Sequence, residues 1–213
     1  MEQKDEKIIV LFAGGSASGK TKICERVVKE LVREGHEEAL NVELDGFYHN
    51  PPEGVSGEDH NWDHPDAFDW KLLADVLTRL KRGESVWLPE HDFENYCQIE
   101  KAKFVNCAGK VILVNGLYTL HNPIIRNLAD YKVFVECDSD IALMRRAIRD
   151  ERERGYSFEI TTMRYTKHVK PAFHEHIEPT RKYADIYIPN QSNVGVEKNI
   201  GVDILIEFLK TRL

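Results

Sequence analysis

Five short stretches of this chain are almost continuously apolar. They cover residues 7–13, 39–44, 110–115, 131–137 and 184–189. A strand that is covered on both faces of a sheet needs apolar side chains at successive positions rather than at alternate ones. We therefore expect these stretches to form buried strands.

Most of the segments between these stretches repeat their apolar residues with the period of a helix. Residues 21–34 place Ile23, Val27 and Leu31 on one face and end at Gly35. Residues 70–80 and 202–212 repeat leucine, isoleucine and valine in the same way, and residues 139–154 begin after a Ser or Asp cap. Strands that alternate with helices predict an α/β fold built on a parallel sheet.

Residues 85–107 interrupt this alternation. Two short apolar runs, 86–88 and 103–106, flank a polar and aromatic segment, which we interpret as a β-type insertion that stands over the sheet. Residues 50–63 are rich in Pro, Gly, Asp and His, have no period and predict a loop. Because the chain shows no repeat or linker, we expect residues 1–213 to form one domain.

The composition is that of a soluble globular protein, with 42% hydrophobic and 31% charged residues. A net charge of −7 argues against nucleic acid or an anionic membrane as the main partner, so any phosphate must be bound locally. The first apolar run is too short for a secretory or membrane-spanning segment. The four cysteines form no CxxC pair. These features predict a cytoplasmic protein with reduced thiols.

A glycine-rich motif follows the first predicted strand and precedes the first predicted helix. Its eight residues fit the pattern G-x-x-x-x-G-K-[ST] and are Gly14, Gly15, Ser16, Ala17, Ser18, Gly19, Lys20 and Thr21. In such a P-loop, the backbone amides and the helix N-terminus surround phosphate oxygens. The lysine reaches the β- and γ-phosphates, and the threonine hydroxyl binds Mg²⁺. The motif predicts a nucleoside triphosphate site.

The second predicted strand ends next to Asp45, which we expect at the crevice where open α/β sheets bind ligands. A carboxylate in that place can accept a proton from an attacking hydroxyl, or hold water on Mg²⁺. The alternative interpretation is an ordinary strand-end aspartate that caps the following turn.

Arginines crowd into residues 145–154 of this otherwise acidic chain. Clustered guanidinium groups in a phosphate-binding protein typically stabilise the charge on the transferred phosphoryl group. Acidic residues are interleaved with them, so a solvated helix of internal ion pairs is the alternative. The arginines are Arg145, Arg146, Arg149, Arg152 and Arg154, of which the first, third and fourth share one helical face.

Several motifs together resemble the uridine–cytidine kinases, P-loop enzymes of nucleoside salvage, over nearly the whole chain after residue 7. Beside the P-loop they include Asp45-Gly-Phe-Tyr48, Asn61-Trp-Asp-His-Pro-Asp-Ala-Phe-Asp69, Met144-Arg-Arg146, Glu153-Arg-Gly155 and Ile177-Glu-Pro-Thr180. The resemblance implies a doubly wound parallel sheet of five strands, with helices on both faces and a β-hairpin at 85–107 over the substrate pocket. It also implies a lid region at 145–165.

The resemblance further implies a role for each matching residue. Asp45, Lys20 and Arg149 would be catalytic, with Asp45 as the general base. Asp63 would hold the ribose hydroxyls. The ATP site would comprise the P-loop with Arg149 and Arg154. The metal site would comprise Thr21, Asp45 and Asn115. The substrate pocket would comprise Asp45, Tyr48, Asp63, His91, Phe93, Tyr96, Arg146, Tyr156 and Arg164.

Some of these positions depart from the family's pattern. Asn115 stands where the family has a glutamate near Mg²⁺, and His91 and Tyr96 exchange the tyrosine and histidine that read the base. Tyr156 replaces an arginine that contacts ribose, and Arg164 replaces a pocket glutamine. Imidazole and phenol can each donate or accept a hydrogen bond, so the groups needed to read a pyrimidine edge are retained.

We therefore expect ATP-dependent phosphorylation of a pyrimidine ribonucleoside, uridine or cytidine, at its 5′-hydroxyl, with Mg²⁺ as cofactor. The resemblance also implies a homotetramer. One alternative is a kinase of the same superfamily that acts on another hydroxylated metabolite. The other is a weakly active nucleotide-binding regulator, which the neutral Asn115 favours and the retention of Asp45 and Lys20 opposes.

Overall fold

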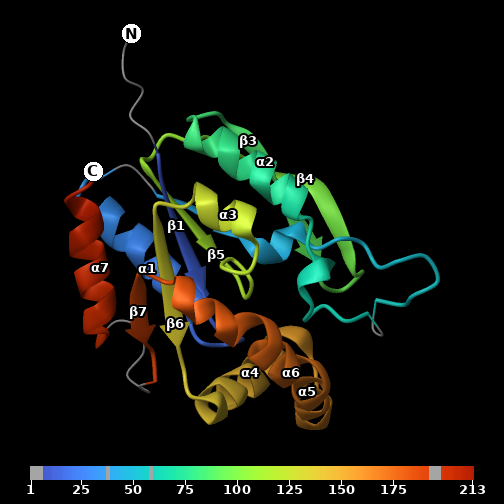
Figure 1. Ribbon diagram of the computed structural model, residues 1–213. Coiled ribbons are helices and arrows are strands. Elements are labelled where there is room, and N and C mark those ends of the chain that lie inside the picture. The colour runs from blue at the N-terminus through green and yellow to red at the C-terminus, as the bar shows by residue number, and fades with distance from the viewer. Residues whose placement is uncertain (1–6, 37–38, 58–59, 192–197) are drawn as a thin grey trace.

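The computed structural model describes residues 7–36, 39–57, 60–191 and 198–213. Its central element is a parallel sheet of five strands in the order β2-β5-β1-β6-β7 (Figure 1). The sheet confirms the predicted doubly wound α/β fold, and each apolar stretch contains one strand within two residues of its expected ends. The strands are β1 Ile8–Ala13, β2 Leu40–Glu43, β5 Val111–Asn115, β6 Tyr131–Glu136 and β7 Ile186–Pro189.

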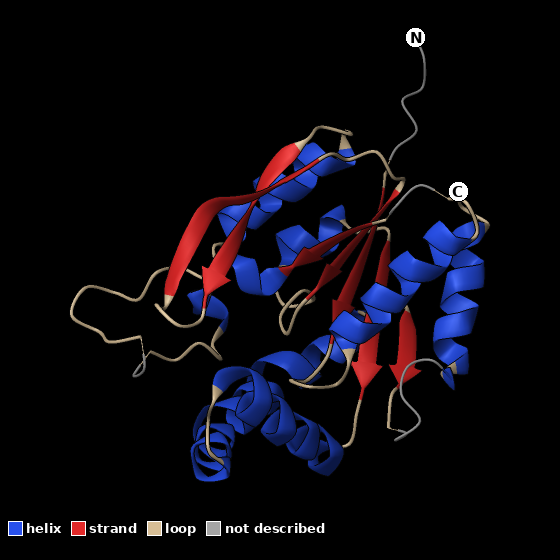
Figure 2. Ribbon diagram, turned by 180° about the vertical axis from the view of Figure 1, so that it is seen from behind, coloured by secondary structure: helices blue, strands red, loops and turns tan. Residues whose placement is uncertain are grey.

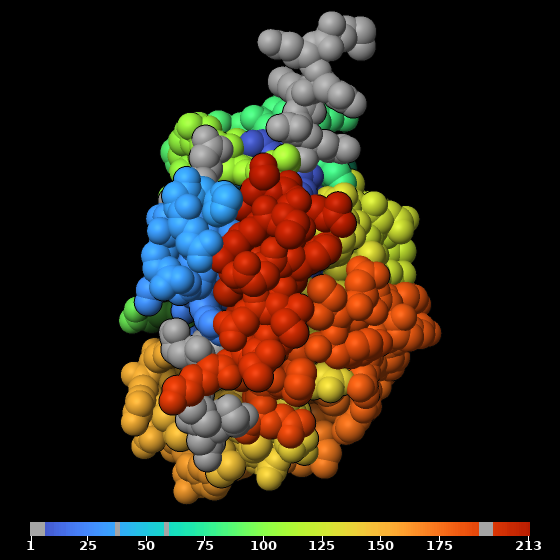
Figure 3. Space-filling view, turned by 90° about the vertical axis from the view of Figure 1, so that its left-hand side faces the viewer, coloured from blue at the N-terminus to red at the C-terminus, as the bar shows by residue number. Residues whose placement is uncertain are grey.

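Helices cover both faces of this sheet because its central strands, β1 and β5, have buried apolar side chains on both sides. On one face, α1 (Lys20–Arg33) and α7 (Ile200–Lys210) pack against Val10 and Phe12 of β1. Figure 3 shows α7 in red beside α1 in blue on this side of the molecule. On the other face, α2 (Trp70–Lys81) and α3 (Pro123–Leu128) cover Ile9 and Leu11.

The insertion is an antiparallel hairpin of β3 (Val86–Asp92) and β4 (Cys97–Val105), separate from the central sheet. Its strands are longer than the apolar runs that predicted them, because most side chains of β4 face solvent and give no hydrophobic pattern. Figure 2 shows the hairpin projecting beside the sheet. The backbone of β3 lies close to the turn after β2, because Gly46 has no Cβ. A Cβ there would lie 2.4 Å from the carbonyl oxygen of Pro89.

A helical region lies beyond the C-terminal ends of the strands (Figure 1). It begins with α4 (Ser139–Arg154), which has the predicted bounds and ends at Gly155 with a φ of 66°. The chain then continues through α5 (Phe158–Arg164) and a series of short helical turns that extends to Tyr183 and includes two π-helical segments, Tyr165–Val169 and Phe173–Ile177. These wide turns break the 3.6-residue period, so periodicity did not predict them.

Within the ranges that the structure describes, no helix is both long and apolar enough to cross a membrane.

Candidate active site

A cavity of about 1170 Å³ opens where the C-terminal ends of β1, β2 and β5 meet the hairpin and the helices α4 and α5, which contain the predicted lid region. Every residue that we predicted for the site outside the P-loop lines this cavity. Five P-loop residues line it as well, namely Ser16, Ala17, Gly19, Lys20 and Thr21. Residues as far apart in the sequence as Ser16 and Asn190 thus share one space.

The P-loop passes from β1 into α1 through three residues with positive φ, Gly14 (144°), Ala17 (59°) and Gly19 (98°). A Cβ on Gly14 would lie 2.3 Å from the carbonyl oxygen of Val135, and one on Gly19 would lie 2.2 Å from the Asn190 amide. That amide, at the end of β7, donates a 2.7 Å hydrogen bond to the Ser18 carbonyl. Asn190 therefore supports the loop, a role that sequence reasoning missed.

Lys20 is a buried cation at the base of the loop. Its Nζ donates hydrogen bonds to the carbonyls of Gly14 (2.9 Å) and Gly15 (2.8 Å). Burial lowers the pKa of Lys20 to about 8, and the negative charge of Asp45 opposes this shift. The ammonium group is thus held next to the position that the P-loop offers to phosphate.

The Thr21 hydroxyl lies in a short chain of polar side chains. It donates a 3.1 Å hydrogen bond to Oδ1 of Asn115, whose Nδ2 donates a 3.0 Å bond to Oδ1 of Asn41. With the Asp45 carboxylate, these residues offer hard oxygen donors of the kind that Mg²⁺ prefers. Among the described residues, no group of three or more His, Cys, Asp or Glu side chains could hold a metal alone. The donor set therefore fits an ion that is held largely by phosphate and water.

Asp45 lies between the two halves of the cavity. It follows β2 within a single 3₁₀ turn, Leu44–Phe47, rather than directly at the strand end. Its charge acts on Lys20 on the phosphate side and on Tyr48, Asp63 and His91 on the other side. A group that receives a proton from an acceptor hydroxyl would need this position.

Aromatic rings line the half of the cavity away from the P-loop. Tyr48 stacks on Phe68 with ring centroids 4.2 Å apart, and the edges of Trp62 and His91 meet it at 5.2 and 5.1 Å. Phe93 packs against His91 at 4.9 Å. Burial lowers the pKa of His91, so its imidazole is neutral near pH 7. Trp62 belongs to a motif that we noted, but we assigned it no role.

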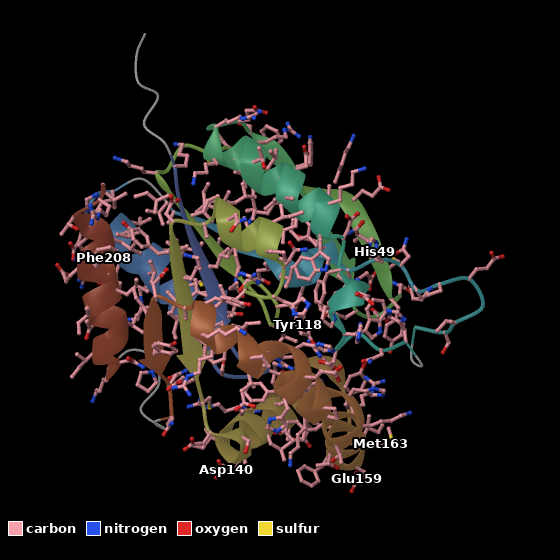
Figure 4. All side chains as sticks on the ribbon, in the orientation of Figure 1. His49, Tyr118, Asp140, Glu159, Met163 and Phe208 are labelled. Atoms are coloured by element: carbon pink, nitrogen blue, oxygen red, sulfur yellow. The ribbon has the colours of Figure 1, made fainter. Side chains whose placement is uncertain are left out.

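Asp63 lies partly buried beside this aromatic wall. Burial raises the pKa of its carboxyl group, and the Arg146 guanidinium, 3.9 Å away, opposes that shift. Tyr118, near the centre of Figure 4, donates a 2.6 Å hydrogen bond to the Asp63 backbone carbonyl. This bond fixes the backbone from which the carboxylate enters the cavity.

The lid arginines converge on Asp150, a carboxylate that is 2% exposed. Arg149 donates to it at 2.8 Å, Arg146 at 3.2 Å, and Arg154 lies 3.7 Å away. Arg146 also donates a 2.8 Å bond to the Ser16 hydroxyl of the P-loop. This network connects α4 to the P-loop. From the sequence, Asp150 stood among the acids interleaved with these arginines and beside Arg149 in a motif of the resemblance, and we assigned it no role.

Tyr96 connects the hairpin to the lid. It has a φ of 53° in the hairpin turn, and its hydroxyl lies 3.4 Å from that of Tyr156. The Arg164 guanidinium covers the Tyr156 ring at 4.4 Å. Burial alone would raise the pKa of Tyr156, but hydrogen bonds with Tyr96 and Arg164 lower it. These three residues form what we call the Tyr96–Tyr156–Arg164 cluster.

Comparison with known proteins agrees with this geometry. A family model described as "Phosphoribulokinase / Uridine kinase family" matches residues 8–197. The uridine kinase of Macrococcus caseolyticus is 38% identical over 201 residues, which cover 92% of this chain and 93% of that protein. Uridine kinase-like protein 3 of Arabidopsis thaliana is 37% identical over 100% of this chain, but the chain spans 44% of that longer protein.

Solved structures share the fold at low sequence identity. D-glycerate 3-kinase from Cryptococcus neoformans superposes with a TM-score of 0.65 at 15% identity, covering 89% of this chain and 87% of that one. At that identity, the likeness concerns the arrangement of helices and strands alone. The family match over most of the chain and the full-length bacterial relative show that this chain belongs to the phosphoribulokinase/uridine kinase family.

Proposed function

We propose that this chain transfers the γ-phosphate of ATP to the 5′-hydroxyl of a pyrimidine ribonucleoside, uridine or cytidine. The observation that carries the proposal is one cavity with a P-loop at one end, aromatic rings at the other and Asp45 between them. Relatives with the names uridine kinase and uridine-cytidine kinase support the choice of acceptor. Family resemblance adds a homotetramer in the cytoplasm to the proposal.

On the phosphate side, the P-loop amides and Lys20 bind the β- and γ-phosphates. Arg149 and Arg154, held by Asp150, face the cavity and stabilise the negative charge that spreads over the transferred group. Mg²⁺, held through Thr21, Asn115 and Asp45, supplies further neutralisation of the phosphate oxygens when it is bound.

On the acceptor side, Tyr48, Phe93 and Trp62 provide apolar surfaces for the base, and Asp63 accepts hydrogen bonds from the ribose hydroxyls. His91 is our candidate for reading the base edge, because its Nδ1 is buried and, among the described residues, has no hydrogen-bond partner. A neutral imidazole can donate or accept there. The Tyr96 hydroxyl faces Tyr156, so we assign Tyr96 to closing the pocket rather than to reading the base.

Asp45 acts at the centre of the reaction. Its carboxylate takes the proton of the 5′-hydroxyl as that oxygen forms a bond with the γ-phosphorus, while the bond from phosphorus to the bridging oxygen breaks and ADP leaves. Lys20 and the lid arginines bind the phosphates in line with the attacking oxygen.

The experiment supplies the protein with ATP and Mg²⁺ and offers uridine, cytidine, 5′-deoxyuridine, nicotinamide riboside or pantothenate as acceptor. Chromatography and phosphorus NMR identify the products. We expect the 5′-monophosphates of uridine and cytidine, with cytidine used at least as well, and one ADP for each. The 5′-deoxyuridine control lacks the attacking hydroxyl and should give no product. Turnover of another acceptor without either pyrimidine nucleoside would show that the substrate assignment is wrong.

A further inference from the structure

The strand next to the P-loop strand ends on a neutral residue. In P-loop enzymes, Mg²⁺ lies between the loop's Ser or Thr and a carboxylate at the end of a neighbouring strand. Here β5 pairs with β1 in parallel and ends at Asn115, which contributes an amide. Both ends of that amide are engaged, one with Thr21 and one with Asn41. Asn115 can therefore orient the Thr21 hydroxyl but adds no negative charge.

A carboxylate stands directly beside it on the next strand. Glu43, the last residue of β2, is the register partner of Asn115 in β5. Paired residues of neighbouring strands project to the same face of a sheet, and so do residues two apart along one strand. Asn41, Glu43 and Asn115 thus share the face that α1 covers, and Glu43 lines the same cavity as Thr21 and Asn115.

The charges around Glu43 favour a cation in this place. Asp45, Glu25 and Glu90 act on it as like charges, and Lys103 acts as the opposite charge. Glu25 lies one helical turn after Thr21 in α1 and lines the same cavity. Crowded carboxylates alone would not locate a metal, but the P-loop threonine does so independently.

We infer that Glu43 is a positioning residue for the Mg²⁺ that accompanies the bound nucleotide, and that it supplies from β2 the negative charge that β5 lacks at Asn115. Its carboxylate accepts hydrogen bonds from water on the ion, and Asn41 keeps the oxygen of Asn115 turned toward Thr21. The inference rests on the part of the proposed function that concerns nucleotide and Mg²⁺, and it is independent of which acceptor is phosphorylated.

The test measures ADP binding by calorimetry with Mg²⁺ and with EDTA, so it requires no acceptor. Outer residues that orient a metal's ligands contribute about 10–100-fold to its affinity. In Glu43→Gln we expect the gain in ADP affinity on adding Mg²⁺ to fall about tenfold. Glu43 is exposed, so the variant folds, and its ADP affinity in EDTA reports that. Glu100→Gln is the matched control, because Glu100 is an exposed carboxylate on β4 that does not line this cavity, and its gain should equal that of the wild type.

A second variant tests the exchange of charge between the two strands. Asn115→Glu should restore the Mg²⁺ gain in the Glu43→Gln background. In the wild-type background it should help much less, because two carboxylates at paired positions repel each other. The inference would be overturned if the gain in ADP affinity on adding Mg²⁺ in Glu43→Gln stayed within about twofold of the wild-type gain. It would also be overturned if Asn115→Glu raised that gain equally in both backgrounds.

Discussion

Lys20 carries its charge at a buried position in the P-loop, and this burial changes the pKa of its ammonium group. Burial disfavours the ammonium form and lowers its pKa from 10.5 to about 8, although the carboxylate of Asp45 favours the charged form. The carbonyls of Gly14 and Gly15 keep the group in place. The residue that binds phosphate is therefore close to losing its charge in mildly alkaline solution.

This pKa predicts how nucleotide binding depends on pH. The free protein loses the Lys20 proton as the pH rises through about 8, and the neutral amine binds the phosphates weakly. The affinity for ADP should therefore be constant below that pH and fall by about tenfold per pH unit well above it. Calorimetry between pH 6.5 and pH 9.5 with Lys20→Arg as a permanently charged control measures this. An affinity in the wild type that stays level up to pH 9.5 would contradict the assignment.

At the scale of elements, the hairpin and the lid meet over the acceptor half of the cavity. Tyr96 comes from the hairpin turn, and Tyr156 from the junction of α4 and α5. Gly57 adds a third segment, since a Cβ there would lie 2.2 Å from the Tyr96 ring. The contact between the Tyr96 and Tyr156 hydroxyl groups thus connects the hairpin to the junction of α4 and α5.

The Tyr96–Tyr156–Arg164 cluster yields a prediction of its own. Tyr96→Phe and Tyr156→Phe each remove the hydrogen bond that the two hydroxyl groups share, which is worth about 1 kcal/mol or about fivefold. Each should raise the KM for the nucleoside by about that factor and leave the KM for ATP unchanged. The effect of the double variant should be smaller than the product of the two single effects, because the shared bond is lost only once. Tyr187→Phe, outside the cavity, is the control. Single effects that multiply in the double variant would refute the shared bond.

Elements with a strong pattern could be predicted from the sequence. Continuous apolar runs locate the five strands within two residues, although only the inner strands are buried on both faces. The lengths of the hairpin strands were underestimated, because their polar segments pair through backbone hydrogen bonds between β3 and β4 and bury few side chains. The turns of 165–183 were missed because π-helical segments have no 3.6-residue repeat.

At the scale of the whole molecule, the predictable part of the site was the part with a local motif. The P-loop is continuous in sequence, and the site residues that we predicted outside it all line the cavity. Asn190 supports that loop from 172 positions away, and Glu43 gains its place from strand register, so no local pattern indicates either. Asp150 is one of several acids in a charged helix, and only the fold shows that it is buried among three arginines.

Asp45 is where the two halves of the molecule's cavity meet, and it offers the most direct test of the account. Asp45→Asn keeps the shape of the side chain but removes the proton acceptor. Turnover and nucleoside binding should be measured separately, by single-turnover kinetics and calorimetry, with the exposed Asp66→Asn as control. We predict that kcat falls by about 10²–10⁴ while the nucleoside Kd is unchanged. A variant that keeps more than half of the wild-type kcat would contradict the account.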